Sequence, residues 1–476
     1  MKVLFVASEA VPFVKTGGLA DVMGSLPVEL RKLGVDARVI LPKYGEIASE
    51  LREKMVLRTH LAISQGWRYQ YFGILEMEHC GVPFYFIDND FFFNRKGLYG
   101  FEDDAERFAF FSGAVLKALP HLDFVPQILH CNDWHTGMLS VFLKIYYQDI
   151  PFYKDIKTIF TIHNLGYQGL FPREMLEDLL DLGPEYFTMD GIEFYGQGSY
   201  LKAGLAFSDY LTTVSKTYAS EIQTRYYGER LDGLLRKRNN ELEGILNGID
   251  YNLYDPMSDP EIPVSYRSSL LKKQQNKQIL QQSLGLPQST DIPMIAFVNR
   301  LVEQKGLDLI MHVIPDILSL DVQVVILGDG EKKYQRFFQS IVKQYPHNFS
   351  FNFNFNDSLA RKIYAASDMF LMPSLYEPCG IGQLIAMRYG SIPIVRETGG
   401  LKDTVIPFTA SNGKGNGFSF RSFNAHDMLF TIRKAVNLYK NKQTWGRLVK
   451  NAVDMDYSWK KPAQQYLELY QRLLGE

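Results

Sequence analysis

The sequence predicts an α/β protein made of two Rossmann-like, doubly wound domains in series. Short apolar runs of strand type alternate with amphipathic stretches of helix type along most of the chain. The alternation stops in a segment rich in Pro, Asp and Asn at 245–266 and then begins again. A length of 476 residues suits roughly two to four domains of about 100–200 residues. We therefore expect domains at 1–243 and 244–455, followed by an amphipathic helix at 456–476 that packs back on the first domain.

In the first half, β-branched and aromatic residues mark buried strands, and apolar residues at helical spacing mark helices. Strands are expected at 2–8, 37–42, 127–133, 157–164 and 210–215, and helices at 24–34, 104–119 and 199–207. The same alternation in the second half predicts strands at 294–301, 322–330, 349–355, 369–374, 391–397 and 417–420, with helices at 306–318 and 333–345.

Composition and charge narrow the class of protein. A net charge of −2 does not favour a nucleic-acid partner. The sequence has no apolar run of about 20 residues, so we expect no membrane partner. Glu9 interrupts the apolar start "MKVLFVASEAVPF", which reads as a first strand and not as a signal peptide. Three scattered cysteines form no disulfide framework, which favours a reduced, cytoplasmic location.

The pattern Thr-Gly-Gly-Leu-x-Asp occurs twice, at 16–21 and 398–403. Each copy follows a strand-type run and precedes a segment that can form a helix. Ligands of doubly wound sheets bind at the carboxyl ends of strands, so the two copies are expected to be matching loops on the two walls of a cleft. For the second copy, a purely structural role stays open.

Cationic and acidic side chains follow strands of the second half. Arg300 lies just past a strand, and Lys305 begins a helix five positions later, which suits a diphosphate. A solvated charged loop is the alternative. Glu377 lies in a loop after another strand, with Gly380 and Gly382 at the start of the next helix. Such a carboxylate would bind sugar hydroxyls or simply cap the helix.

Polar residues also end two strands of the first half. "HCNDWHTG" carries His130, Asp133 and His135, and "FTIHNLGYQG" carries His163. A metal site is conceivable, but these residues do not share one helix face, so we favour polar groups that line a cleft. The pair Asp88-x-Asp90 is only a weak metal signal. We expect neither a metal nor a cofactor. No full G-x-G-x-x-G follows the first strand, which disfavours hydride chemistry with a dinucleotide, and neither a Walker loop nor a nucleophile elbow occurs.

Together, "KTGGLADV", "CNDWHTG", "TIHNLGYQG", "NRLVEQKG", "YEPCGIGQLIAMRYG" and "TGGLKDTV" resemble the bacterial glycogen synthase and plant starch synthase family over nearly the whole chain. These are retaining glucosyltransferases of the GT-B fold. The resemblance implies ADP-glucose and glycogen, an α-1,4-glucan, as substrates. It does not decide between ADP-glucose and UDP-glucose, and it leaves the oligomeric state unknown.

The resemblance also assigns roles to residues. Arg300 and Lys305 would hold the diphosphate, Glu377 the glucose, and His163 would lie near the transferred sugar. The remaining donor or acceptor contacts would be Lys15, Gly17, Gly18, Asp21, Asp133, Asn247, the base-stacking Phe355, and the amides at Gly380 and Gly382.

One position departs from the Glu-x7-Glu pattern of many retaining GT-B enzymes, because position 385 is Ile385. A simple double displacement with two carboxylates is therefore disfavoured, and same-face attack is preferred. A glucan phosphorylase that holds pyridoxal phosphate on a lysine, a transferase that uses a metal at Asp88 and Asp90, and a non-catalytic glycan-binding protein are the rival interpretations.

Overall fold

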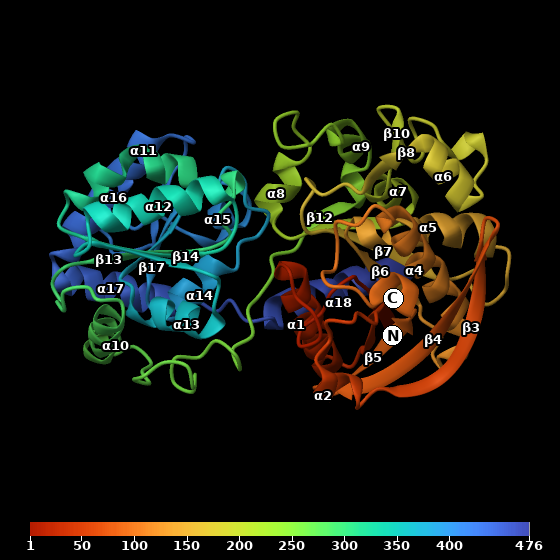
Figure 1. The fold of residues 1–476 in the computed structure, drawn as a ribbon, viewed down its shortest axis with the longest axis horizontal. Coiled ribbons are helices and arrows are strands. Elements are labelled where there is room, and N and C mark those ends of the chain that lie inside the picture. Colours follow the sequence, from red (N-terminus) through yellow and green to blue (C-terminus); the bar gives the residue numbers. More distant parts are fainter. Residues whose placement is uncertain (476) are drawn as a thin grey trace. The chain divides into compact units, whose positions relative to one another are not determined.

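A computed structural model describes residues 1–475. These residues form two compact units. The first unit contains Met1–Asn247 together with the chain from Trp459 onward, and the second contains Gly248–Ser458. Each unit has its own sheet (Figure 1). Each also has its own hydrophobic core. Within residues 1–475, no helix is long and apolar enough to cross a membrane.

The first unit is built on a nine-stranded sheet with the order β12-β11-β7-β6-β1-β2-β5-β4-β3. Its strands are β1 (Lys2–Val6), β2 (Asp36–Pro42), β3 (Val56–Gln65), β4 (Arg68–His79), β5 (Val82–Asp88), β6 (Ile128–Asn132), β7 (Lys157–Ile162), β11 (Tyr210–Thr213) and β12 (Leu242–Gly244). All neighbouring pairs are parallel except β3–β4 and β4–β5, which are antiparallel. The sequence did not predict this antiparallel extension, because β3 and β4 are exposed on one face and lack the continuous apolar runs of buried strands.

Helices and a small second sheet complete the first unit. The helices are α1 (Gly18–Lys32), α2 (Ser49–Arg52), α3 (Asp90–Phe93), α4 (Asp104–Ala118), α5 (Gly137–Phe142), α6 (Arg173–Leu180), α7 (Tyr200–Phe207), α8 (Lys216–Glu221) and α9 (Asp232–Lys237). The small sheet has the order β8-β10-β9, from β8 (Leu170–Pro172), β10 (Gln197–Ser199) and β9 (Glu193–Phe194).

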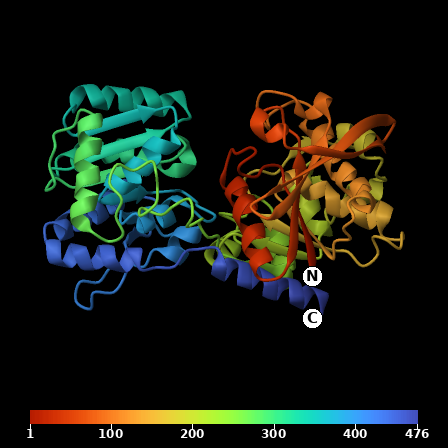
Figure 2. The same ribbon diagram turned by 90° about the horizontal axis from the view of Figure 1, so that it is seen from below.

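The last helix, α18 (Lys460–Leu474), belongs to the first unit, as the sequence predicted. Its buried face, which includes Tyr466 and Tyr470, joins the core of that unit. The Tyr470 hydroxyl lies 2.7 Å from Nδ1 of His130 on β6. Figure 2 shows α18 alongside α1 near both chain ends. The C-terminal helix is thus held by apolar packing and by a buried hydrogen bond.

The second unit has a six-stranded parallel sheet with the order β15-β14-β13-β16-β17-β18. The strands are β13 (Met294–Val298), β14 (Gln323–Gly328), β15 (Phe349–Phe353), β16 (Met369–Met372), β17 (Ile392–Arg396) and β18 (Phe418–Phe420). The helices are α10 (Leu270–Ser283), α11 (Leu307–Leu318), α12 (Lys332–Gln344), α13 (Asp357–Ala366), α14 (Gly382–Arg388), α15 (Gly399–Thr404), α16 (Ala425–Tyr439) and α17 (Lys442–Val453). The expected strands and helices of both halves are therefore present, and the segment 245–266 forms no helix or strand of either sheet.

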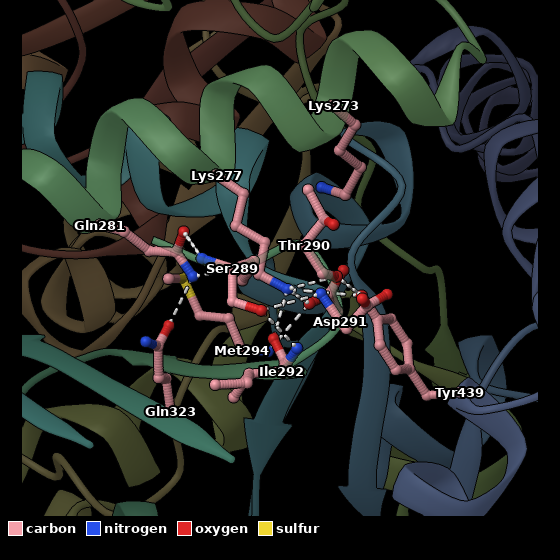
Figure 3. Close-up of polar contacts among 12 residues, drawn as sticks. Lys273, Lys277, Gln281, Ser289, Thr290, Asp291, Ile292, Met294, Gln323 and Tyr439 are labelled. Atoms are coloured by element: carbon pink, nitrogen blue, oxygen red, sulfur yellow. Dashed lines mark hydrogen bonds and ion pairs between the residues drawn. The ribbon is translucent and has the colours of Figure 1, made fainter. Parts of the chain in front are cut away.

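A buried lysine fixes α10 on the second unit. Lys277 Nζ donates to Asp368 Oδ2 at 2.7 Å. It also donates to the carbonyl of Ile292 at 2.5 Å (Figure 3). One turn away, Lys273 donates to three main-chain carbonyls, and burial lowers its pKa to about 7. Because buried charges need partners, this cluster specifies where α10 docks.

Candidate active site

The first Thr-Gly-Gly copy forms the loop before α1. Gly17 is the N-cap of this helix, and Gly18 is its first residue. Lys15 Nζ pairs with Asp21 Oδ1 at 2.7 Å. The structure thus brings Lys15, Gly17, Gly18 and Asp21 together at the carboxyl edge of β1.

Glu9 is hydrogen-bonded to this loop, a contact that the sequence did not predict. Its carboxylate accepts hydrogen bonds from the main-chain N–H of Thr16 at 2.5 Å and from the Thr16 hydroxyl at 2.8 Å. The side chain is buried, with 4% exposed, and burial raises its pKa. The signal in the sequence was a carboxylate inside an otherwise apolar N-terminal run.

Asp133 and His163 meet where β6 and β7 end. The main-chain N–H of His163 donates to Asp133 Oδ1 at 2.8 Å, and its ring Nε2 lies 2.9 Å from Asn132 Oδ1. Burial raises the pKa of Asp133 to about 7 and lowers that of His163 to about 3. His163 is therefore a neutral imidazole at neutral pH, able to bind polar groups without adding charge.

The two other histidines of this region have different surroundings. His130 uses both ring nitrogens inside the core, because Nε2 lies 2.6 Å from the Thr161 hydroxyl and Nδ1 faces Tyr470. This engagement leaves it no free nitrogen for a metal. His135 is buried and stacks on Trp134 with ring centroids 4.0 Å apart, and neither of its ring nitrogens has a hydrogen-bond partner within the described chain.

Asp88, Asp90 and Asn247 complete the residues singled out in the first unit. Asp88 forms an ion pair with Lys43 at 2.9 Å, and Asp90 begins α3. Across residues 1–475, no cluster of three His, Cys, Asp or Glu side chains suited to a metal ion occurs. Asn247 follows β12 and is buried, and its Oδ1 accepts no hydrogen bond from the residues described.

In the second unit, Lys305 and Glu377 form a buried ion pair. Lys305 Nζ lies 2.9 Å from Oε1 and 2.7 Å from Oε2 of Glu377. The Ser374 hydroxyl donates to Glu377 Oε2 at 2.9 Å. Both charged side chains are 8% exposed. A buried charge pair at the carboxyl ends of two neighbouring strands is typical of a polar ligand site.

Close backbone contacts fix the two loops that carry this pair. Leu375 N–H donates to the carbonyl of Gln304 at 2.8 Å. Gly306 has a φ of +73°, and a Cβ there would lie 2.1 Å from the Pro373 carbonyl oxygen. Only glycine tolerates both this left-handed φ and this close contact. Position 306 therefore requires glycine where the Lys305 and Glu377 loops meet.

The second Thr-Gly-Gly copy packs directly on the Glu377 loop. Gly399 has a φ of +43°, and its Cβ would lie 1.9 Å from the Glu377 carbonyl oxygen. The N–H of Gly400 donates to the carbonyls of Glu377 and Pro378, both at 3.2 Å. Thr398 is the N-cap of α15. This copy therefore supports the Glu377 loop through its backbone.

The sheet order places the remaining site residues in a row along the carboxyl edge. Phe355 follows β15 and is exposed, Arg300 and Lys305 follow β13, and Glu377 follows β16. Strands of a sheet lie about 4.8 Å apart, so β15 and β16 are about 14 Å apart along the order β15-β14-β13-β16. The row therefore runs from an exposed ring past two cations to a carboxylate.

Gly380 and Gly382 lie between Glu377 and α14. Gly380 has a φ of +72°, and Gly382 is the first residue of α14. The Gln383 side chain donates to the Gly380 carbonyl at 2.8 Å and to the Cys379 carbonyl at 3.2 Å, which stiffens the turn. Ile385 is buried in the core, so this position offers no second acidic group.

Comparisons with known proteins cover both units. The family "Starch synthase catalytic domain" matches residues 2–237, and "Glycosyl transferases group 1" matches residues 280–452. A glycogen synthase of Desulforamulus reducens is 57% identical over 100% of this chain and 99% of its own length. A glycogen synthase of Clostridioides difficile is 54% identical over 99% of each chain.

A solved structure supports the same relationship. The catalytic domain of starch synthase IV from Arabidopsis thaliana, bound to ADP and acarbose, superposes with a TM-score of 0.91 at 34% identity. The alignment covers 100% of this chain and 99% of that one. It confirms the predicted fold class, and the full-length relatives confirm the resemblance found in the sequence. The chain therefore belongs to the glycogen synthase and starch synthase family of retaining glycosyltransferases with the GT-B fold.

Proposed function

We propose that this chain is a glycogen synthase that transfers glucose from ADP-glucose to the non-reducing end of an α-1,4-glucan with retention of configuration. The proposal rests on the row of side chains along the carboxyl edge of the second sheet. Their order matches the order of base, diphosphate and glucose in a nucleotide sugar. Phe355 suits a base, Arg300 and Lys305 suit the diphosphate, and Glu377 suits the hydroxyls of the glucose. The starch synthase of similar structure is bound to ADP and acarbose, which supports the nucleotide and the glucan as ligand classes.

The residues of the first unit would act on the transferred sugar and the acceptor. His163 is a neutral hydrogen-bonding group beside Asp133, and Lys15 adds a cation near the loop amides. Asn247 has a buried oxygen without a partner in the described chain, which suits a substrate hydroxyl. Gly17, Gly18, Asp21, Gly380 and Gly382 remain proposed contacts of the donor.

The reaction needs one bond to break and one to form. The bond between C1 of glucose and the β-phosphate oxygen breaks, and the acceptor O4 bonds to C1 from the same face. The leaving nucleoside diphosphate takes the acceptor's proton. Arg300, Lys305 and Lys15 stabilise the charge that develops on the diphosphate. The Glu377 carboxylate is already paired with Lys305, which suits it to binding sugar hydroxyls better than to attack on C1.

We also propose the cytoplasm as its location, supported by three free cysteines. The division into 1–243, 244–455 and 456–476 remains our proposal for the functional domains. In the structure, the first compact unit ends at Asn247 and takes up the chain again at Trp459, a few residues from these boundaries.

The test is glucosyl transfer to glycogen in the presence of EDTA, with ADP-glucose and UDP-glucose compared side by side. Faster transfer from ADP-glucose, with product chains that an α-1,4-specific exoglucosidase removes, is the expected result. Faster transfer from UDP-glucose would retain the chemistry and change the donor. Activity that needs added magnesium or manganese would refute the cation-only stabilisation of the leaving group.

A further inference from the structure

The loop between β16 and α14 carries Glu377 and is held along its main chain. The carbonyls of residues 374–378 each accept a hydrogen bond. The N–H of Gly400 holds the last two of these carbonyls. Two side chains from other loops, Arg396 and Gln304, hold the first three. A main chain that is fixed at five successive carbonyls has little freedom, so these donors determine where the Glu377 carboxylate lies.

Arg396 is the last residue of β17 and is buried. Its Nη1 donates to the carbonyl of Leu375 at 2.5 Å and to the carbonyl of Ser374 at 3.4 Å. The guanidinium lies 5.7 Å from the ring centroid of Phe423. The Ser374 hydroxyl in turn donates to Glu377 Oε2 at 2.9 Å. Because a guanidinium is planar and its donors point in fixed directions, Arg396 fixes the residue that is hydrogen-bonded to the carboxylate.

Gln304 joins the Glu377 loop to the loop that carries Lys305. It lies directly before Lys305 and is half-buried. Its carbonyl accepts the N–H of Leu375 at 2.8 Å, and its side-chain amide donates to the carbonyl of Tyr376 at 3.1 Å. The next residue, Glu377, pairs with Lys305 itself. Three successive residues of one loop thus contact two successive residues of the other, so the two loops are held at a fixed distance.

We propose that Arg396 and Gln304 are positioning residues for the transfer reaction, which hold Glu377 in register with the cations that bind the diphosphate. This inference rests on the proposed function, in which Glu377 binds the hydroxyls of the glucose. Both residues act through the main chain of the Glu377 loop and not through contact with the substrate. A displacement of about 1 Å in a group that orients a reacting sugar can lower the rate about a hundredfold.

A comparison of ADP with ADP-glucose separates this role from a general loss of structure. ADP has the base and the diphosphate but no glucose, so its binding would depend on Arg300 and Lys305 and not on Glu377. Lys305 keeps a main-chain hydrogen bond within its own loop, because its N–H donates to the carbonyl of Val302 at 3.0 Å. Release of the Glu377 loop should therefore impair the turnover of ADP-glucose and leave the binding of ADP nearly unchanged.

The test combines steady-state transfer from ADP-glucose with titration calorimetry of ADP on the full chain. In Arg396→Met, kcat/KM for ADP-glucose should fall at least about tenfold, and the Kd for ADP should change less than about twofold. Arg396→Lys keeps a donor and should be intermediate. Equal losses of kcat/KM and of ADP affinity in Arg396→Met would overturn the proposal.

Arg238→Met is the matched control. Arg238 Nη1 also donates to two main-chain carbonyls, those of Leu205 at 2.6 Å and Ser208 at 2.7 Å. Ser208 precedes β11, so this contact lies at the amino edge of the other sheet, away from the proposed site residues. The variant loses the same kind of contact, and its kcat/KM and its Kd for ADP should equal those of the wild type.

Amide hydrogen exchange of the substrate-free protein gives a measurement that needs no activity. The N–H of Leu375 is hydrogen-bonded to Gln304, so its exchange reports whether the Glu377 loop opens. It should become faster in Arg396→Met and stay unchanged in Arg238→Met. The same rate in Arg396→Met as in the wild type would overturn the proposal. An inactive wild type would refute the proposed function alone, because the exchange rates would still decide whether Arg396 holds the loop.

Gln304→Met provides the test if Arg396→Met does not fold. It removes only the hydrogen bond to the carbonyl of Tyr376, from a half-buried position. We expect kcat/KM for ADP-glucose to fall about threefold, with the Kd for ADP nearly unchanged. An unchanged kcat/KM in this variant would overturn the proposal.

Discussion

Lys305 and Glu377 are 72 positions apart in the chain, and the lysine contacts both oxygens of the carboxylate, at 2.9 and 2.7 Å. The pair is buried at the end of β13 and β16, with Ser374 as a further donor. One side chain is proposed for the diphosphate and the other for the sugar, so the ion pair would hold the two groups in register before a donor arrives. Charges that are already in position need little free energy for reorganisation during a reaction.

Removal of the lysine should affect both turnover and stability. We expect Lys305→Ala to lower kcat at least about tenfold, because a charge on the leaving diphosphate loses its partner. The unpaired Glu377 should also lower the free energy of unfolding by about 3–5 kcal/mol. Lys343→Ala, on the exposed end of α12, is the control and should change neither. Near-normal kcat in a folded Lys305→Ala protein would contradict the role.

The second Thr-Gly-Gly loop can be tested through its glycine. Gly399→Ala places a Cβ 1.9 Å from the Glu377 carbonyl oxygen, so the Glu377 loop must move. We expect a loss of about 1–3 kcal/mol from overpacking, in addition to the cost of the left-handed backbone, and a large fall in kcat.

Gly285→Ala is a matched control for this substitution. Its φ of +69° is similarly left-handed, but no atom lies within 4 Å of the added Cβ. It should lower the melting temperature through backbone strain alone and leave the kinetic constants unchanged. If Gly399→Ala and Gly285→Ala behave alike in both melting and kinetics, the loop contact has no part in the site.

Strands buried on both faces were predictable, because parallel sheets give continuous apolar runs such as "MIAFV" and "QVVILG". The ribbon of β3 and β4 was not, since one face is exposed and its aromatic residues alternate with polar ones. The same pattern predicted that Arg300 and Glu377 each lie just after a strand. The ion pair of Lys305 and Glu377 did not, because a sequence gives the edge that a residue occupies but not its partner across neighbouring strands.

Tertiary contacts also decided the roles of residues that looked alike in the sequence. His130 and His163 both end buried strands, but His130 bonds to Thr161 and Tyr470 inside the core, while His163 contacts Asp133. Glu9 appeared only as an interruption of an apolar run. Its contact with Thr16 depends on the fold of the loop between β1 and α1, which no local pattern encodes.

Asp133 should make stability depend on pH in the neutral range. Its pKa is raised from 3.8 to about 7, so between these values the folded protein keeps a proton that the unfolded chain releases. Stability from this group is therefore present at low pH and is lost as pH rises toward 7. Asp133→Asn cannot titrate, so it should gain stability relative to the wild type as pH rises from 4 to 7, with no further change above.

Melting curves at several pH values for both proteins measure this difference. His130 and His163, with pKa values lowered to about 3, titrate in both proteins, so their contributions largely cancel in the subtraction. The amide of Asn can still accept the hydrogen bond from the main-chain N–H of His163, which preserves the local geometry. A wild-type minus variant difference that does not change with pH would refute the raised pKa.

Glu9 is expected to act as a positioning residue for the loop that carries Lys15. The carboxylate accepts hydrogen bonds from both the N–H and the hydroxyl of Thr16, so Glu9→Ala removes both contacts and frees the loop. We expect a severalfold rise in KM for the nucleotide sugar and a fall in kcat, with Glu9→Gln intermediate because its amide oxygen can still accept one hydrogen bond. Glu29→Gln, which removes a carboxylate from α1 where it pairs with Lys32 at the surface, is the control and should behave like the wild type. A purely structural role would lower the melting temperature of Glu9→Ala but leave KM and kcat unchanged in the folded protein, and that outcome would contradict the assignment.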